Sequence, residues 1–231
     1  MSFVWNEKLV ISPSLITLDM CNLESQVHQL EEAGLKMLHI DILDGHFSPS
    51  MPLGLDTVRQ LRKRTKLEFD CHVMVTEPEF FINELLDIGV QSIAFHVETA
   101  SHIDGMLNRI HAEGVRAGVA LKPATPLYQL EYVLEKCDIV TLMLINPGFA
   151  QVKGEQQVPY SDRKIRELRA MIDERGLNTK IEIDGRISPA NIETYGKGIV
   201  DYFVCGSTCL IKDNLPGSIA RLNAMRSRIL G

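Results

Sequence analysis

Apolar residues occur in short runs along the 231-residue chain, and segments with a helical spacing of apolar positions separate these runs. Each run is rich in aliphatic or β-branched residues and is bounded by turn-forming residues, which is the pattern of a β-strand. Eight such runs predict strands at residues 9–16, 37–43, 67–75, 91–98, 115–121, 138–146, 180–184 and 200–205.

Between the predicted strands, apolar residues recur every three or four positions, as on one face of an amphipathic helix. Several of these segments end at a glycine, where helices commonly stop, and one has Pro78 near its start. The predicted helical segments are residues 22–34, 77–89, 102–114, 126–136 and 162–176.

Eight strands that alternate with helices, without a linker, predict an α/β fold of the (β/α)8 barrel type, with a single domain over residues 1–231. The alternative is an open, doubly wound sheet. Sheets of that kind that bind dinucleotides carry a GxGxxG fingerprint after the first strand, and this chain has none there. Eight units would also be many for one small open sheet, so the barrel is favoured.

The overall charge limits the classes of partner. A formal net charge of -6 and an isoelectric point near 5.7 argue against nucleic acid or an anionic membrane as the main partner. The longest apolar run, residues 139–145, is too short to span a bilayer, and the first ten residues lack the apolar core of a signal peptide. Five cysteines without a CxxC pair favour reduced thiols, so we expect a cytoplasmic protein.

Polar residues stand where several predicted strands end, and barrel enzymes place their chemistry at those ends. His39 and Asp41 are two residues apart on the second predicted strand, so their side chains share one face. The same spacing puts His72 and Met74 on one face of the third strand. Asp184 ends the seventh strand. These side chains are therefore expected to converge at one mouth of the barrel.

His39, Asp41, His72 and Asp184 together form a plausible site for a divalent metal ion. Mixed nitrogen and oxygen ligands suit zinc, iron(II), manganese or cobalt better than calcium. Taken singly, each residue also fits a structural role, since strand histidines are often hydrogen-bonded core residues and an aspartate before a glycine often forms a turn. Their coincidence at the same end of separate strands favours the metal site.

Glycine-containing loops follow the last three predicted strands. Gly148 lies after the sixth strand and Gly185 after the seventh, and after the eighth strand Gly206, Ser207 and Thr208 could open a helix whose N–H groups face an anion. Each glycine alone is typical of a turn. Three such loops at neighbouring strand ends predict a phosphate site, as many (β/α)8 barrels have there.

Other polar residues favour structural roles. His96 and Glu98 share one face of the fourth predicted strand, where a structural hydrogen bond is slightly favoured over a catalytic role. Three cysteines lack a histidine partner at a useful spacing and are expected to pack in the core: Cys71, Cys205 and Cys209.

The chain also resembles a known family. Its motifs, in chain order, are "SPSLITLD", "HIDILDGHFSP", "DCHVMVTEP", "FHVET", "KPATPL", "INPGFA", "IEIDGRISPANI" and "CGST". They are similar to those of the ribulose-phosphate 3-epimerases and their ketohexose-phosphate relatives, in the same order. The resemblance covers residues 11–210 and implies the same barrel fold.

This resemblance implies an isomerase that inverts carbon 3 of a ketose phosphate through an enediolate, stabilised by a divalent metal ion. It implies that Asp41 and Asp184 exchange protons on opposite faces of that intermediate and also bind the metal. His39 and His72 would bind the metal, and Asp44 would support the site. It also suggests a homo-oligomer, either a dimer or a hexamer. The substrate contacts it implies are Ser14, His72, Met74, Met143, Gly148, Gly185, Gly206 and Ser207.

Four departures from the family pattern lie on pocket-side loops: Leu43, Lys122, Arg186 and the loop over residues 150–159. We therefore predict a metal-dependent epimerase of the D-ribulose 5-phosphate to D-xylulose 5-phosphate type. D-Allulose 6-phosphate, converted to D-fructose 6-phosphate, is the alternative substrate. Two rivals are a non-catalytic sugar-phosphate sensor and a barrel for decarboxylation or aldol cleavage, for which Lys122 is the one tempting Schiff-base lysine.

Overall fold

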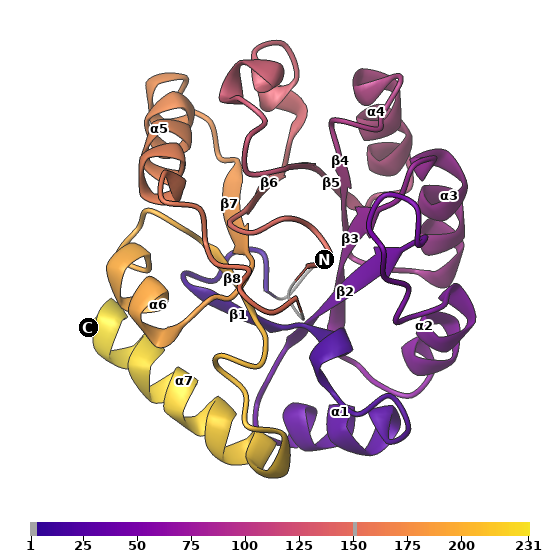
Figure 1. Ribbon diagram of the computed structural model, residues 1–231, viewed down its shortest axis with the longest axis vertical. Coiled ribbons are helices and arrows are strands. Elements are labelled where there is room, and N and C mark those ends of the chain that lie inside the picture. The colour runs from indigo at the N-terminus through magenta and orange to yellow at the C-terminus, as the bar shows by residue number, and fades with distance from the viewer. Residues whose placement is uncertain (1–3, 150–151) are drawn as a thin grey trace.

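All eight predicted strands form, and they pair in parallel as one sheet in the order β1-β8-β7-β6-β5-β4-β3-β2. The structure is a computed structural model that describes residues 4–149 and 152–231. Strands surround the centre of the molecule and helices form the outer layer (Figure 1). The strands are β1 (Val10–Pro13), β2 (Met37–Leu43), β3 (Glu68–Met74), β4 (Ser92–His96), β5 (Arg116–Leu121), β6 (Ile139–Met143), β7 (Lys180–Asp184) and β8 (Tyr202–Cys205).

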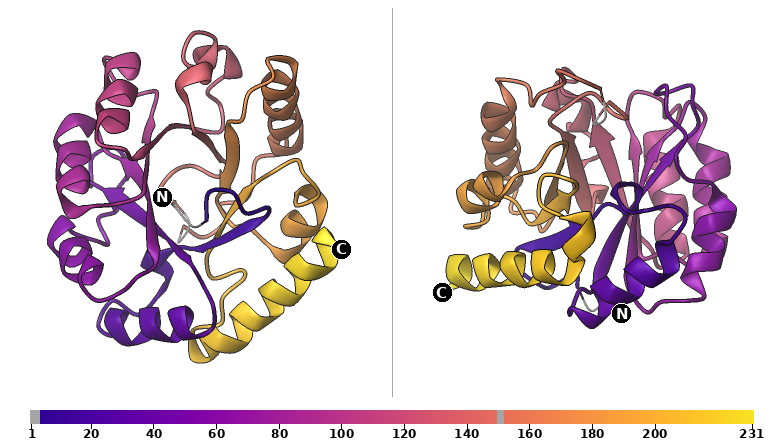
Figure 2. Two further views of the ribbon diagram at one scale, coloured as in Figure 1. Left: turned by 180° about the vertical axis from the view of Figure 1, so that it is seen from behind. Right: turned by 60° about the horizontal axis from the view of Figure 1, so that its bottom comes forward.

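The ring of strands closes between β1 and β2. An isolated parallel bridge joins Ser14, just after β1, to His39 within β2. Seen from behind, the helices again form the outer layer around the strands (Figure 2). The predicted (β/α)8 barrel is thus confirmed, and its closure lies beside one of the predicted metal ligands.

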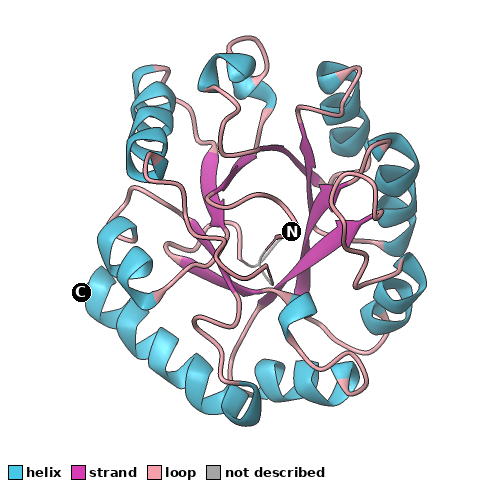
Figure 3. Cartoon of the chain, viewed as in Figure 1, coloured by secondary structure: helices cyan, strands magenta, loops and turns pink. Residues whose placement is uncertain are grey.

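Seven α-helices cover the barrel within the described residues (Figure 3). In helix α3 (Pro78–Ile88), Pro78 is the first residue, and Gly89, with a φ of 84°, follows the last. Both agree with the predicted start and stop signals. The helices are α1 (Leu23–Glu32), α2 (Leu55–Arg62), α3 (Pro78–Ile88), α4 (Ile103–Ala112), α5 (Ser161–Glu174), α6 (Pro189–Tyr195) and α7 (Leu215–Leu230).

The helix predicted over residues 126–136 is wrong. Only two short 3-10 turns form there, at Leu127–Leu130 and Leu134–Lys136. Leu130 and Leu134 are buried in the core, as the apolar spacing predicts, whereas Tyr128 and Tyr132 are 71% and 94% exposed. Two 3-10 turns are therefore enough to place the apolar residues of this segment in the core.

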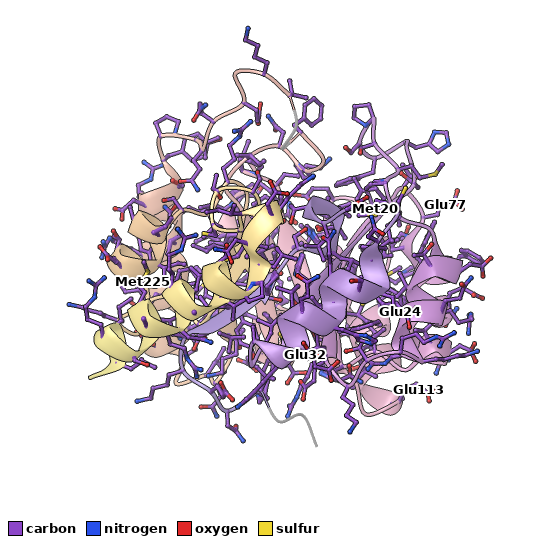
Figure 4. The ribbon with its side chains drawn as sticks, turned by 90° about the horizontal axis from the view of Figure 1, so that it is seen from below. Met20, Glu24, Glu32, Glu77, Glu113 and Met225 are labelled. Carbon is purple, nitrogen blue, oxygen red and sulfur yellow. The ribbon has the colours of Figure 1, made fainter. Side chains whose placement is uncertain are left out.

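Apolar side chains close the amino end of the barrel. Val4, Met37, Ile139 and Tyr202 belong to a buried cluster at the amino ends of the strands, and Trp5 packs against it. Figure 4 views the barrel from the side. Met20 and Glu77, which follow β1 and β3, lie toward one end, whereas Glu32 and Glu113, which precede β2 and β5, lie toward the other. No helix of the described residues is both long and apolar enough to cross a membrane.

Candidate active site

Four polar side chains meet inside the carboxyl end of the barrel, as the sequence predicts. We call His39, Asp41, His72 and Asp184 the ligand cluster; one nitrogen or oxygen from each lies within 4.8 Å of all the others. Asp41 Oδ1 is 3.4 Å from His39 Nε2 and 3.8 Å from His72 Nδ1. His72 Nδ1 is in turn 3.7 Å from Asp184 Oδ2. These spacings leave room for a shared cation between the four groups.

Strand geometry explains this convergence. Side chains two apart in a strand point to the same face, so His39 and Asp41 both point inward from β2. In the parallel register, Asp41 stands beside His72 of β3. Asp184 is the last residue of β7, on the far side of the ring in the strand order. Three strands therefore supply the cluster from different sides.

The cluster fits a divalent metal ion by its unsatisfied atoms. His39 Nε2 and His72 Nδ1 are buried, and within the described part of the chain neither makes a hydrogen bond. An unpaired buried nitrogen is costly, whereas a metal ion that displaces the proton from each ring would satisfy both nitrogens at once. Two imidazoles and two carboxylates form a ligand set suited to zinc, iron(II), manganese or cobalt.

A buried carboxylate orients the first histidine. His39 Nδ1 lies 2.9 Å from Asp70 Oδ2, and the Ser92 hydroxyl donates to the other oxygen of Asp70. Glu182 lies next to this pair, with Oε2 3.7 Å from His39 Nδ1, and accepts a 2.8 Å hydrogen bond from Thr141. Because the outer nitrogen is held in this way, the Nε2 atom of His39 is directed into the ligand cluster.

A second histidine, His96, orients His72. His72 Nε2 is 3.0 Å from His96 Nε2, and His96 Nδ1 is 2.8 Å from Glu98 Oε2. Burial lowers the pKa of His96 to about 4. Neutral His96 then donates from Nδ1 to Glu98 and accepts at Nε2 from His72. His72 Nδ1 then faces the cluster, where burial alone would lower the pKa of His72 but Asp184 and Asp41 raise it. The structural hydrogen bond predicted for His96 and Glu98 is present.

Charges within the cluster keep its central carboxylate ionised. Burial alone would raise the pKa of Asp41, but His39 and His72 beside it hold this pKa well below its usual range. Burial would likewise lower the pKa of His39, but Asp41 and Glu182 raise it well above its usual value. Ser14 Oγ donates a 2.6 Å hydrogen bond to Asp41 Oδ2, which leaves Oδ1 directed toward the histidines.

A cavity of about 140 Å³ opens beside the ligand cluster. Both carboxylates of the cluster, Asp41 and Asp184, line it. Of the predicted substrate contacts, only His72 is absent from its lining; it is buried behind the carboxylates. The other predicted contacts all line this one cavity: Ser14, Met74, Met143, Gly148, Gly185, Gly206 and Ser207.

The end of the cavity away from the histidines is formed by loops. We call Gly148, Gly185, Gly206 and Ser207 its glycine end. Gly148 has a φ of 76°, and a Cβ there would lie 1.7 Å from Ser48 Oγ. A Cβ on Gly185, with a φ of 110°, would lie 2.7 Å from an Ile145 side-chain carbon. At both positions, backbone alone fits the space.

The helix predicted to open at residues 206–208 is wrong. These residues form a turn in which the N–H groups of Cys209 and Leu210 both donate to the Gly206 carbonyl at 2.9 Å. The next α-helix, α7, begins only at Leu215, where Pro216 suits the first turn and Asn214 caps it. The glycine end is therefore a set of turns, without the helix start that we expected.

Sequence reasoning missed further cavity residues in the loops after β1 and β2: Ile16, Thr17, Ser50 and Pro52. They carry no periodic signal, because they lie outside the strands. Asp44, expected to support the site, accepts hydrogen bonds from the N–H groups of His46, Phe47 and Thr76. It thereby fixes the loop that follows β2.

Two further departures from the family pattern also have clear positions. Leu43 lines the cavity, whereas Lys122 is not among its described lining residues. Lys122 instead places its ammonium 4.0 Å from the centre of the Phe47 ring, a cation–π contact. This geometry gives no support to a Schiff base at Lys122.

Comparison with known proteins agrees with this geometry. The model of the ribulose-phosphate 3-epimerase family matches residues 10–210. The chain belongs to the ribulose-phosphate 3-epimerase family. Ribulose-phosphate 3-epimerases are isomerases of carbohydrate phosphates, so the predicted enzyme class is confirmed.

Curated relatives resemble the chain over most of its length. It is 36% identical to ribulose-phosphate 3-epimerase of Synechocystis sp., over 93% of each chain. It is 34% identical to the enzyme of the same name from Methanocaldococcus jannaschii, over 92% of this chain and 88% of the relative. The enzyme of that name from Escherichia coli K12 is 33% identical, over 87% and 88%.

Solved structures support the fold at much lower sequence identity. The 3-keto-L-gulonate-6-phosphate decarboxylase of Vibrio cholerae superposes with a TM-score of 0.71 at 12% identity, over 96% of this chain and 99% of the other. The tryptophan synthase α-subunit of Pyrococcus furiosus superposes with a TM-score of 0.64 at 14% identity, over 97% and 98%. At such identities, the likeness concerns the barrel alone.

Proposed function

We propose that the chain is a metal-dependent 3-epimerase that interconverts D-ribulose 5-phosphate and D-xylulose 5-phosphate. One observation carries this proposal: two carboxylates, Asp41 and Asp184, line one cavity and belong to a cluster with two unsatisfied buried imidazole nitrogens. The family and its relatives supply the substrate class.

Inversion at carbon 3 requires a proton to leave one face of the substrate and another to arrive at the opposite face. Asp41 on β2 and Asp184 on β7 approach the cavity from different sides of the ring. One would take the proton as general base while the other donates as general acid. The depressed pKa of Asp41 keeps this carboxylate ionised, which is the form that binds a cation and that a general base requires.

His39 and His72, together with both carboxylates, would hold the divalent metal ion. When bound, the ion supplies Lewis-acid stabilisation for the negative charge that develops on the sugar oxygens. Ser14 positions Asp41 through its 2.6 Å hydrogen bond and lines the cavity. Met74 and Met143 give that part of the wall an apolar surface, which excludes water from the planar intermediate.

The glycine end would receive the phosphate group. Gly148, Gly185 and Gly206 carry no side chain of their own, so their backbone can approach an anion closely. The cavity then has a ligand cluster at one end and an anion site at the other. That arrangement suits a short sugar with a terminal phosphate.

D-Allulose 6-phosphate is the second candidate substrate. The observation that favours it is the position of Leu43 and Arg186, two departures from the family pattern, in the cavity lining. A change in the wall of a substrate cavity is the expected way to accept a sugar with one more carbon.

We also propose that residues 1–231 form one catalytic domain, which assembles as a homo-oligomer, a dimer or a hexamer, and works in the cytoplasm. The exposed aromatic side chains of Phe80, Tyr128 and Tyr132 support an oligomer, since large exposed apolar groups are common where subunits meet. Light scattering coupled to size-exclusion chromatography measures the mass directly. A monomer would contradict this part of the proposal.

The deciding experiment is deuterium exchange at carbon 3 in D2O, followed by NMR, with D-ribulose 5-phosphate and D-allulose 6-phosphate in parallel. Protein stripped of metal with a chelator is compared with protein reloaded with zinc, iron(II), manganese or cobalt. We expect exchange with inversion that disappears on stripping and returns on reloading. The faster sugar identifies the substrate. Absence of exchange with both sugars in the reloaded, folded protein would refute the proposed reaction.

A further inference from the structure

The residue after Gly185 adds a positive charge to the glycine end. Arg186 lines the same cavity as Gly148, Gly185, Gly206 and Ser207. Its lining residues with a formal charge are Asp41, Asp184 and Arg186, so Arg186 is the one cation among the described lining residues. A sugar phosphate brings further negative charge to a cavity that already holds two carboxylates, and a cation beside the phosphate offsets that charge.

The backbone at this position is unusual for a residue with a side chain. Arg186 has a φ of 52°. Among the described residues, Leu9 is the one other non-glycine residue with a positive φ. This left-handed conformation places Cβ close to backbone atoms, so it is unfavourable for every residue except glycine. A glycine would adopt it without strain. Such strain is found where a side chain serves a function at that position.

The side chain is held at the cavity by the neighbouring loop. It is half-buried, and its Nη2 donates a 3.3 Å hydrogen bond to the carbonyl of Val152. This contact joins the loop after β7 to the loop after β6, the two loops that supply Gly185 and Gly148. The planar guanidinium carries several donors in a rigid fork, which matches the oxygens of a phosphate.

We propose that Arg186 binds the substrate phosphate through its guanidinium group. The inference rests on the proposed function, whose anion site it completes. Arg186 acts through charge and paired hydrogen bonds, in addition to the backbone of the glycine end. Its role is therefore binding, separate from the proton transfers at Asp41 and Asp184.

The test compares Arg186→Gly and Arg186→Lys with the wild type. Lys153→Gln is the matched control, because it removes a cation from the loop after β6 at an exposed position outside the cavity lining. Arg186→Gly should raise KM for D-ribulose 5-phosphate by roughly 10- to 100-fold, the range for a lost charge-assisted hydrogen bond, with little change in kcat. Arg186→Lys keeps the charge without the fork and should fall between. Lys153→Gln should behave as wild type.

A second measurement reads phosphate binding without turnover. Inorganic phosphate is titrated into each metal-loaded variant, and the rise in Tm is recorded relative to the same variant without phosphate. The Arg186→Gly variant should lose most of this rise, while its own Tm without phosphate stays equal or increases, because glycine relieves the strained φ. Lys153→Gln should keep the full rise.

The two readouts separate the possible failures. If Arg186→Gly keeps the full stabilisation by phosphate and an unchanged KM, the proposal is overturned and Arg186 is a tether between loops. If the wild type shows no exchange with either sugar, the proposed reaction fails. The phosphate titration then still decides whether Arg186 binds the anion.

Discussion

The two ends of the cavity are built in different ways. The histidines of the ligand cluster stand on β2 and β3, which pair through seven successive registered positions, and hydrogen-bonded partners hold their outer nitrogens. The glycine end consists of turns that follow β6, β7 and β8. Strands thus hold the histidines of the ligand cluster, whereas loops form the glycine end, where we propose that the phosphate binds.

This contrast predicts that changes in the ligand cluster abolish the reaction, whereas changes in the glycine end alter binding. Asp184→Asn should have the largest effect. The amide keeps the size of the side chain but neither accepts nor returns a proton, so exchange at carbon 3 should fall at least about 1000-fold. Exchange in D2O measures this, with circular dichroism to confirm folding. Asp56→Asn, on the exposed first turn of α2, is the control. An Asp184→Asn variant with wild-type exchange would remove Asp184 from the reaction.

Gly148→Ala should act at the other end of the cavity. A Cβ there would lie 1.7 Å from Ser48 Oγ at a φ of 76°, so the loop must shift. We expect a loss of about 2–4 kcal/mol in the free energy of unfolding, from the strained backbone and overpacking. KM should rise while bound metal is unchanged. Gly54→Ala is the control, since nothing lies within 4 Å of its added carbon. Loss of metal from Gly148→Ala would show that the two ends are coupled.

Glu98→Gln tests the support behind the ligand cluster. It removes the ionised partner of His96 and should weaken the orientation of His72, two contacts away from the metal site. We expect metal affinity to fall by about 10-fold, measured by competition with a chelating dye. The exposed Glu113→Gln should leave the affinity unchanged. Equal affinities in all three proteins would mean that the His72 orientation does not depend on Glu98.

Asp44→Asn should have the smallest effect, a change in how stability depends on pH. The direction of this change follows from the pKa of Asp44. Burial opposes ionisation of Asp44, but N–H donors from Thr76, Phe47 and His46 lower its pKa from 3.8 to about 2. Its contribution to stability is therefore present above pH 3.8 and is lost as the pH falls toward 2. The free energy of unfolding, measured with urea, should fall more for the wild type than for the variant across this pH interval. Parallel curves would show that these hydrogen bonds add no stability.

The same contrast explains what the sequence could predict. His39, Asp41 and Met74 follow the two-residue period of a strand, so their shared direction could be read before the structure was known. Thr17 and Ser50 could not be found in this way, because loop residues obey no period. The turn at Gly206 was mistaken for a helix start for the same reason.

The type of turn was the other source of error. The segment over residues 126–136 buries Leu130 and Leu134, as its apolar spacing predicts, yet it forms only 3-10 turns. Apolar spacing indicates which side chains are buried, but short 3-10 turns can satisfy it as well as an α-helix can. The buried partners Ser92 and Glu182 were also missed, although Glu182 stands two residues before Asp184 on β7 and therefore shares its face.

The bridge from Ser14 to His39 gives the barrel a seam. Backbone pairing between β1 and β2 consists of this bridge in the described chain, whereas β1 pairs with β8 at four positions. Ser14 also reaches across the seam to Asp41, so a bound sugar phosphate touching both would fasten the ring shut. Ligand binding stabilises the state that it prefers, so amide hydrogens along the seam should exchange with solvent more slowly in the complex. The bound substrate would then complete the connection between β1 and β2 that backbone pairing leaves short.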